Sequence, residues 1–427
     1  MKVLMFGWEF PPHIAGGLGT ACYGLCKGLL KHGVEVVFVV PKAYGDEDQS
    51  VAKIVNAGEV EINLNDPVYQ QINSNLTYIT IGSKLVPYMG FEDWLRLENM
   101  SKEEGLKIEN DTHTKFTFSG QYKQNLMEEV HNYAMTAATI AQKHDFDLVH
   151  AHDWLCYEAG IAAKKATAKP LVIHVHATEF DRSGKNVNTI VYDIERRGML
   201  EADRVLTVSN LTRQIVIEKY GIDPSKVKTV YNAVEPIPGR DESKIYRPFS
   251  EKIVTFLGRI TYQKGPEYFV EAAHRILQKD DNVRFVMAGN GDMLNKMVRR
   301  VAALGIGRKF HFTGFLKGLD VDTMFRMSDV YVMPSISEPF GISPLEAMRA
   351  HVPVVISNQS GCAEILQNAI KVDFWDVDAL SNAIYGLLHY RALHDAFSRD
   401  SAAEVDNLKW ENAALNNIKQ YNRVLGW

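Results

Sequence analysis

The chain has 427 residues, more than one ordinary hydrophobic core organises, so we expect two domains. Hydrophobic residues make up 46% and charged residues 23%, the proportions of a soluble globular protein. The net charge of -5 excludes the strongly basic composition typical of proteins that bind nucleic acid or anionic membranes, so neither partner is expected.

The cysteines and the N-terminus indicate a reducing compartment and no membrane insertion. Cys22, Cys26, Cys156 and Cys362 are scattered, and the first two, one helical turn apart, are interpreted as reduced helix residues. The N-terminal apolar run is too short for a signal peptide. No apolar run approaches the ~20 residues of a membrane-spanning helix. We therefore expect a cytoplasmic protein without a transmembrane segment.

The chain opens with a strand, a glycine-rich loop, a helix and a second strand. Residues 2–8 form an apolar strand run, Gly16 and Gly17 lie in the loop, and residues 34–40 form the next strand. This unit is typical of a doubly wound parallel sheet. Glycines at such a turn allow the backbone to approach a phosphate, although many α/β domains need them only for a tight turn.

The stretch from residue 44 to 125 has no clear periodicity. Two strand-like runs, 60–64 and 76–81, precede an irregular segment at 83–123, which is long for a plain loop. Aromatic residues stand there among polar ones: Tyr88, Phe91, Trp94, Phe116 and Phe118. Because aromatic faces stack on sugar rings, the segment is either an acceptor-facing insertion or a separate small packed layer.

Two predicted strand ends carry pairs of histidines. His150 and His152 end one strand, and His174 and His176 lie on one face of the next. These are interpreted as ordinary strand-end residues, because no third metal ligand at a suitable spacing stands out.

A charged run with prolines divides the chain. We expect an N-terminal Rossmann-like domain at residues 1–236, a linker at 237–250 and a second domain of alternating strands and helices at 251–405. A last helical pattern occupies residues 406–427.

The first strand of the second domain ends in two cations, Arg259 and Lys264. A buried cation at a strand end needs an anion. A diphosphate suits this pair, because arginine is planar and multidentate while lysine acts as a point charge. An internal carboxylate or simple solvation of the cations is the alternative.

The stretch from Met333 to Met348 predicts a strand, a tight loop and a short helix. We expect Ser343 to cap the helix and Pro344 to take its first position. Helix N-termini attract phosphate, and the carboxylates of Glu338 and Glu346 accept hydrogen bonds from sugar hydroxyls. Ser343 and Glu346 also fit a capping box, so a structural role for Glu346 stays open.

The run Glu338-Pro-Phe-Gly-x-x-x-Leu-Glu346 resembles the E-x7-E motif of retaining GT-B glycosyltransferases, in particular family 4 and the glycogen synthase-like enzymes. The Arg259/Lys264 pair and the Gly16-Gly17-Leu loop are similar to that family's phosphate-binding elements. Ile14 stands where bacterial glycogen synthases carry a lysine, so the broader α-glycosyltransferase family fits better. The resemblance implies two Rossmann-like doubly wound domains facing a central cleft, with the terminal helix returning to the N-terminal domain.

The resemblance also implies roles for single residues. Glu338 would hold sugar hydroxyls, Asp153 and His176 would orient the sugar, and Glu346 would hold the ribose. We expect Glu179, in the loop after a strand, to contact the acceptor. The implied donor-binding set is Gly16, Gly17, Arg259, Lys264, Gly289, Phe315, Gly341, Ile342, Ser343 and Glu346.

We therefore expect retaining transfer of a hexosyl unit, preferentially glucosyl, from a nucleotide diphosphate sugar to a glycan acceptor, preferentially an α-glucan. No cofactor or metal is expected, because Arg259 and Lys264 neutralise the leaving diphosphate. The alternatives are a surface-polysaccharide or lipid-linked α-glycosyltransferase, a sugar-nucleotide 2-epimerase of the same fold, and a non-catalytic carbohydrate-binding protein.

Overall fold

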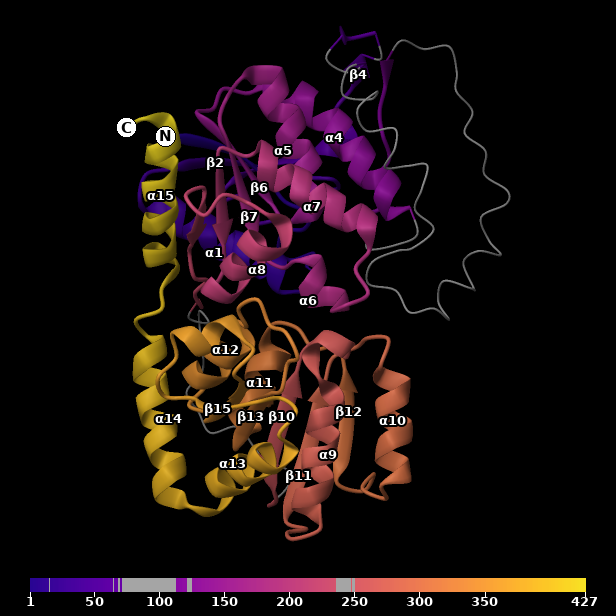
Figure 1. Cartoon of the computed structure of the whole chain (residues 1–427), viewed down its shortest axis with the longest axis vertical. Helices are drawn as coiled ribbons and strands as arrows, with labels where there is room; N and C mark the ends of the chain where they lie inside the picture. The colour runs from indigo at the N-terminus through magenta and orange to yellow at the C-terminus, as the bar shows by residue number, and fades with distance from the viewer. Residues whose placement is uncertain are drawn as a thin grey trace, which may run out of the picture.

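The computed structural model describes residues 1–14, 16–63, 65–67, 70, 113–120, 125–235, 247 and 250–427. Two α/β domains lie one beyond the other along the long axis, each built on a parallel sheet with helices on both faces (Figure 1). The α/β class and the two Rossmann-like domains expected from the sequence are confirmed.

The first domain is a seven-stranded parallel sheet. Its apolar strands are buried on both faces, as expected for parallel strands between helices. In spatial order the strands are β3 (Lys53–Asn56), β2 (Glu35–Val40), β1 (Lys2–Phe6), β6 (Leu148–His152), β7 (Leu171–Val175), β8 (Arg204–Thr207) and β9 (Val227–Thr229).

Helices cover both faces of this sheet. One core lies under α4 (Leu126–Lys143), α5 (Trp154–Thr167) and α7 (Thr189–Glu201), and the other lies under α1 (Gly17–Lys31). The remaining elements of the domain are η1 (Ala57–Glu59), α6 (Glu179–Ser183), α8 (Asn210–Tyr220) and an antiparallel pair, β4 (Ile62–Asn63) and β5 (His113–Thr114).

The second domain is a six-stranded parallel sheet. Its spatial order is β12 (Phe310–Gly314), β11 (Val283–Ala288), β10 (Lys252–Leu257), β13 (Val330–Met333), β14 (Val354–Ser357) and β15 (Ile370–Val372). The surrounding helices are η2 (Tyr262–Lys264), α9 (Pro266–Leu277), α10 (Leu294–Ala303), α11 (Leu319–Met327), α12 (Ser343–Arg349), η3 (Gly361–Glu364), α13 (Val377–His389) and α14 (Arg391–Val405).

The chain crosses back to the first domain in its last helix, α15 (Trp410–Leu425). Figure 1 shows α14 beside the second domain and α15 beside the first, with the two chain ends close together. Trp410 lies against Gly24 and Gly28 of α1, where any side chain beyond hydrogen would collide with it. The Tyr421 hydroxyl lies 2.7 Å from His150 Nδ1, so α15 contributes to the core over the first sheet.

Several local predictions differ from the structure. The helix pattern near residues 376–393 is two helices, because the chain breaks at Tyr390 between α13 and α14. The strand expected at 60–64 is reduced to Ile62 and Asn63. The second strand-like run, nearly all of the irregular segment and most of the linker lie outside the described residues.

Candidate active site

The strand order places a switch point in each sheet. In the first sheet the order reverses between β1 and β6, and in the second between β10 and β13. Open α/β sheets bind ligands beyond the carboxyl ends of the strands at this position. Nearly all predicted site residues follow strands β1, β6, β7, β10 and β13, so the topology brings them toward the boundary between the domains.

Glu338 and Lys264 form an ion pair at the switch point of the second domain. Glu338 is buried, its amide donates to the Gln359 carbonyl, and its carboxylate lies 3.3 Å from the Ser335 hydroxyl. Lys264 is half-buried at the end of η2. The internal carboxylate that the sequence left open as a partner for Lys264 is therefore present, and it is the motif glutamate itself.

Arg259 follows β10 and is exposed at the domain boundary. Burial raises the pKa of Asp153 in the first domain and of Asp292 in the second, and the charge of Arg259 opposes the rise in both. The charge of Arg259 therefore acts on a carboxylate of each domain.

Asp153 has a strained backbone. It lies between β6 and α5 with φ 62° and ψ 167°, a region that is nearly restricted to glycine. Its amide donates to the His174 carbonyl at 2.9 Å, which helps to hold this conformation. The side chain is buried, and its Oδ1 atom has no hydrogen-bond partner among the described residues. Strain together with an unpartnered buried oxygen is typical of a functional site.

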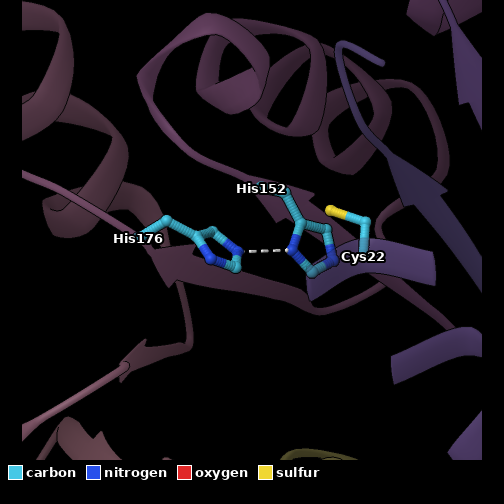
Figure 2. A group of neighbouring side chains, drawn as sticks. All are labelled: Cys22, His152 and His176. Atoms are coloured by element: carbon cyan, nitrogen blue, oxygen red, sulfur yellow. Dashed lines mark hydrogen bonds between the residues drawn. The ribbon is translucent and has the colours of Figure 1, made fainter. Parts of the chain in front are cut away.

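His176 follows β7 and is half-buried. Its Nε2 atom lies 2.9 Å from Nδ1 of His152, at the end of β6 (Figure 2). Burial lowers the pKa of His176 to about 3, so the ring is neutral at physiological pH. A neutral ring has one donor and one acceptor nitrogen, and the contact with His152 uses one of them.

Gly16 and Gly17 begin α1 at the switch point of the first domain. Gly16 is the N-cap, Gly17 is the first helical residue, and both are exposed. A Cβ atom at either position would meet nothing within 4 Å. Glu9 caps one amide, because its carboxylate accepts from Gly19 N at 3.0 Å. The two glycines at the start of this helix therefore border open space.

The short helix α12 begins one residue earlier than predicted. Ile342 is the N-cap and Ser343 is the first helical residue, so the expected cap and the capping-box alternative are both wrong. The Ser343 hydroxyl lies 2.8 Å from that of Tyr331, which explains why it does not cap the helix. Gly341, in the loop before α12, has a left-handed backbone with φ 96°. Burial raises the pKa of Glu346, and the positive charge of Arg349 partly offsets this rise.

Gly289 and Phe315 follow neighbouring strands, β11 and β12. Gly289 has φ 138°, and a Cβ there would lie 1.8 Å from the Gly258 carbonyl oxygen, so only glycine fits. Phe315 is 58% exposed, which leaves its ring available for stacking on a planar ligand.

Two family models match the chain. "Glycosyltransferase Family 4" matches residues 122–236, and "Glycosyl transferases group 1" matches residues 240–403. The first match covers strands β6 to β9 of the first sheet, and the second covers all six strands of the second sheet. The chain is a GT-B glycosyltransferase.

Known proteins resemble this glycosyltransferase over nearly its whole length. An uncharacterized glycosyltransferase of Methanocaldococcus jannaschii is 27% identical, and the match covers 99% of this chain and 98% of that protein. A glycogen synthase of Mycobacterium tuberculosis is 23% identical over 99% of this chain and 94% of its own. The structure of HepE from Anabaena in complex with UDP and glucose has a TM-score of 0.68, with 16% identity, 99% coverage of this chain and 100% of its own.

Glu179 was expected in a loop after a strand, and this expectation is wrong. Glu179 is not a loop residue but the first residue of α6, and it is buried. One carboxylate oxygen accepts from the Ser183 hydroxyl at 2.8 Å and the Asn188 amide at 3.1 Å, and the other accepts from Arg182 Nε at 3.2 Å. Because these groups occupy both oxygens, the side chain braces α6 in this structure.

Sequence reasoning missed the residues that join the two domains. Ser337 Oγ donates to Asp181 Oδ1 at 2.6 Å, one residue before Glu338. The Glu364 carboxylate of the second domain accepts from the backbone amides of Asn210 and Leu211, at 2.9 and 2.7 Å, at the start of α8. An acidic residue near a helix N-terminus is a recognisable signal, but nothing in the sequence indicates that the helix belongs to the other domain.

No helix of the described residues combines the length and the apolarity that crossing a bilayer requires.

Proposed function

We propose that this glycosyltransferase moves a hexosyl unit, preferentially glucosyl, from a nucleotide diphosphate sugar to an α-glucan, with retention of configuration. One observation carries the proposal. Lys264 and Glu338 are paired at the switch point of the second domain, and the charge of Arg259 from the same domain acts on Asp153 of the first. A cation pair beside a buried carboxylate suits a ligand with a diphosphate on one side and sugar hydroxyls on the other.

The leaving group is the nucleotide diphosphate. Arg259 and Lys264 neutralise the charge that develops as the bond between the anomeric carbon and the phosphate oxygen breaks, so no divalent cation is needed there. The backbone amides of Gly16 and Gly17, at the start of α1, are proposed to supply further donors. The acceptor oxygen forms its bond on the same face of the sugar, and its proton goes to the departing phosphate oxygen.

The sugar is held from the first domain. Asp153 presents an unpartnered buried oxygen, which suits a sugar hydroxyl as donor. The imidazole of His176 is neutral, and one of its nitrogens is proposed to contact the same sugar. Glu338 accepts from hydroxyls on the opposite side, and its charge favours the oxocarbenium-like centre. Glu346 is proposed to hold the ribose.

An α-glucan is proposed as acceptor because the Gly16-Gly17-Leu, His152-Asp153-Trp154 and His176 elements resemble glucan synthases. The glycogen synthase relative, which aligns over nearly the whole chain, gives independent support.

The test is a donor and acceptor screen that follows nucleotide diphosphate release from UDP-, ADP- and GDP-sugars, with and without maltooligosaccharides. We expect glucan-dependent release from UDP- or ADP-glucose and an α-linked product by NMR. Lys264→Ala should abolish most of this release. Lys296→Ala is the matched control, because Lys296 lies on the surface of α10 and pairs with Glu267.

The other outcomes decide between alternatives. A β-linked product would overturn retention. Release from GDP-mannose or an N-acetylhexosamine donor alone would overturn the glucan acceptor and favour surface-polysaccharide assembly. Acceptor-independent formation of an epimer would favour the 2-epimerase.

A further inference from the structure

Four histidines form a stack beneath α1 in the first domain. His150 and His152 come from β6, and His174 and His176 come from β7 and the residue just beyond it. Their ring centroids lie 4.1 Å apart for His150 and His152 and 4.6 Å apart for His174 and His176. The parallel register pairs His152 with His174 across the two strands. All four rings therefore project from the same face of the sheet.

The stack contains buried nitrogens without hydrogen-bond partners among the described residues. They are Nε2 of His150, Nε2 of His152 and both ring nitrogens of His174. These three side chains are at most 3% exposed. Buried polar atoms are nearly always satisfied, so this group of nitrogens is unusual, and one of them belongs to His152, a residue of the ligand set proposed below.

The fold adds a cysteine to the stack. Cys22 lies in α1, and Figure 2 shows its sulfur beside the ring of His152, with His176 on the other side of that ring. One ligand atom from each of the three residues lies within 4.8 Å of the other two. Zinc bonds of about 2.0–2.3 Å would place tetrahedral ligand atoms about 3.3–3.8 Å apart, so small side-chain rotations bring the three into range.

We propose that Cys22, His152 and His176 form a binding site for a transition-metal ion of the zinc class. Two imidazoles and a thiolate are a ligand set that zinc prefers. Binding replaces the thiol S–H bond with a bond from sulfur to the metal and releases the proton to solvent. His176 is half-buried, which gives the ion a route from the surface.

The site has a direct consequence for His176. Its Nε2 atom faces Nδ1 of His152, and the proton between the two rings belongs to either nitrogen. A metal on Nε2 fixes the tautomer with hydrogen on Nδ1, and it thereby makes the other edge of the ring a permanent donor. The metal therefore acts as a positioning device. Its existence does not depend on the function proposed above.

A second set, His150, His152 and His174, also lies within 4.8 Å. It is fully buried and has no sulfur ligand, and His150 already contacts the Tyr421 hydroxyl. The set with Cys22 is preferred because it combines a thiol with access from the surface.

The test uses protein produced without a polyhistidine tag in zinc-supplemented medium, with metal content measured by mass spectrometry. We expect about one zinc ion per chain in the wild type. Cys22→Ala should lose it. Cys26→Ala is the matched control and should retain it, because Cys26 is buried one turn further along α1 but lies against Met5 instead of the histidines.

Cobalt substitution gives a second readout that needs no variant. Co²⁺ bound by the wild type should show a thiolate-to-cobalt charge-transfer band, and Zn²⁺ should raise the thermal unfolding temperature. The proposal would be overturned if the wild type retained no zinc above background after incubation with Zn²⁺. It would also be overturned if the cobalt spectrum lacked the thiolate-to-cobalt charge-transfer band. Equal zinc in wild type and Cys22→Ala would do the same. If Cys22→Ala does not fold, the cobalt spectrum of the wild type decides alone.

Discussion

Replacing Asp153 by glycine should stabilise the protein relative to replacing it by alanine. Both substitutions remove the carboxylate, so they differ only in the Cβ atom that conflicts with φ 62° and ψ 167°. At an ordinary position the order is the opposite, because glycine increases the entropy of the unfolded chain. The sign of the difference between the two variants therefore reports the backbone strain.

The magnitude follows from two opposing effects. Backbone strain in this region costs about 1–3 kcal/mol for a residue with a Cβ atom. Glycine in place of alanine lowers the free energy of unfolding by about 0.4–1 kcal/mol, because it increases the entropy of the unfolded chain. The free energy of unfolding should therefore be about 0.5–2 kcal/mol higher for Asp153→Gly than for Asp153→Ala. For a domain of this size the corresponding difference in Tm is about 1–8 °C. Both variants should lose the same fraction of kcat/KM, because they lack the same proposed sugar contact.

The assay is thermal unfolding followed by circular dichroism, with kcat/KM measured in parallel. Ala168→Gly is the control, because Ala168 ends α5 in the left-handed region with φ 57° and has no proposed role in the site. It should gain stability with unchanged activity. If Asp153→Ala is at least as stable as Asp153→Gly while the control gains stability, the strain at Asp153 does not exist.

Three further predictions concern charge. Arg259→Ala and Lys264→Ala should each cost about 2–4 kcal/mol of transition-state stabilisation, roughly 30- to 1,000-fold in kcat/KM, and near-wild-type turnover in both would contradict the diphosphate assignment. Initial rates should not change with added Mg²⁺ or after brief EDTA treatment, and a loss that only Mg²⁺ or Mn²⁺ restores would show a cation at the diphosphate. Burial lowers the pKa of His150, His152 and His174 below the value of about 6.5 in the unfolded chain. The unfolded chain therefore binds more protons than the folded chain at acidic pH. The free energy of unfolding should fall as the pH drops below about 6.5, by up to about 1.4 kcal/mol per histidine per pH unit. Urea unfolding between pH 7 and 5 measures this loss, which should shrink in His174→Asn.

The architecture could be predicted because alternating strands and helices are a local signal. The same signal placed the site, since the loops after β1, β6, β10 and β13 must meet at the switch points. Arg259 and Lys264 were proposed because charged residues after a buried strand are conspicuous in a sequence, and Glu338 was proposed from the loop before α12 and its resemblance to the E-x7-E motif.

Features that depend on long-range packing could not be predicted. Cys22 and His152 meet because α1 packs over the end of β6, so the proposed third ligand could not be found from the sequence. The occupied carboxylate of Glu179 depends on neighbours set by the fold of α6 and α7. The strained backbone of Asp153 could not be predicted either, because aspartate at a helix N-cap ordinarily takes an unstrained extended conformation.

The return of α15 to the first domain affects how the chain folds during synthesis. The core under α1 includes Trp410, Ala414 and Tyr421, so the N-terminal domain lacks part of its interior until α15 leaves the ribosome. Roughly 180 residues separate the end of β9 from the start of α15, which corresponds to about 10–40 s of translation at ~5–20 residues per second. During that time the apolar groove beside Gly24 and Gly28 is uncovered. The second domain can complete its core first, and the nascent chain needs protection from aggregation in the interval.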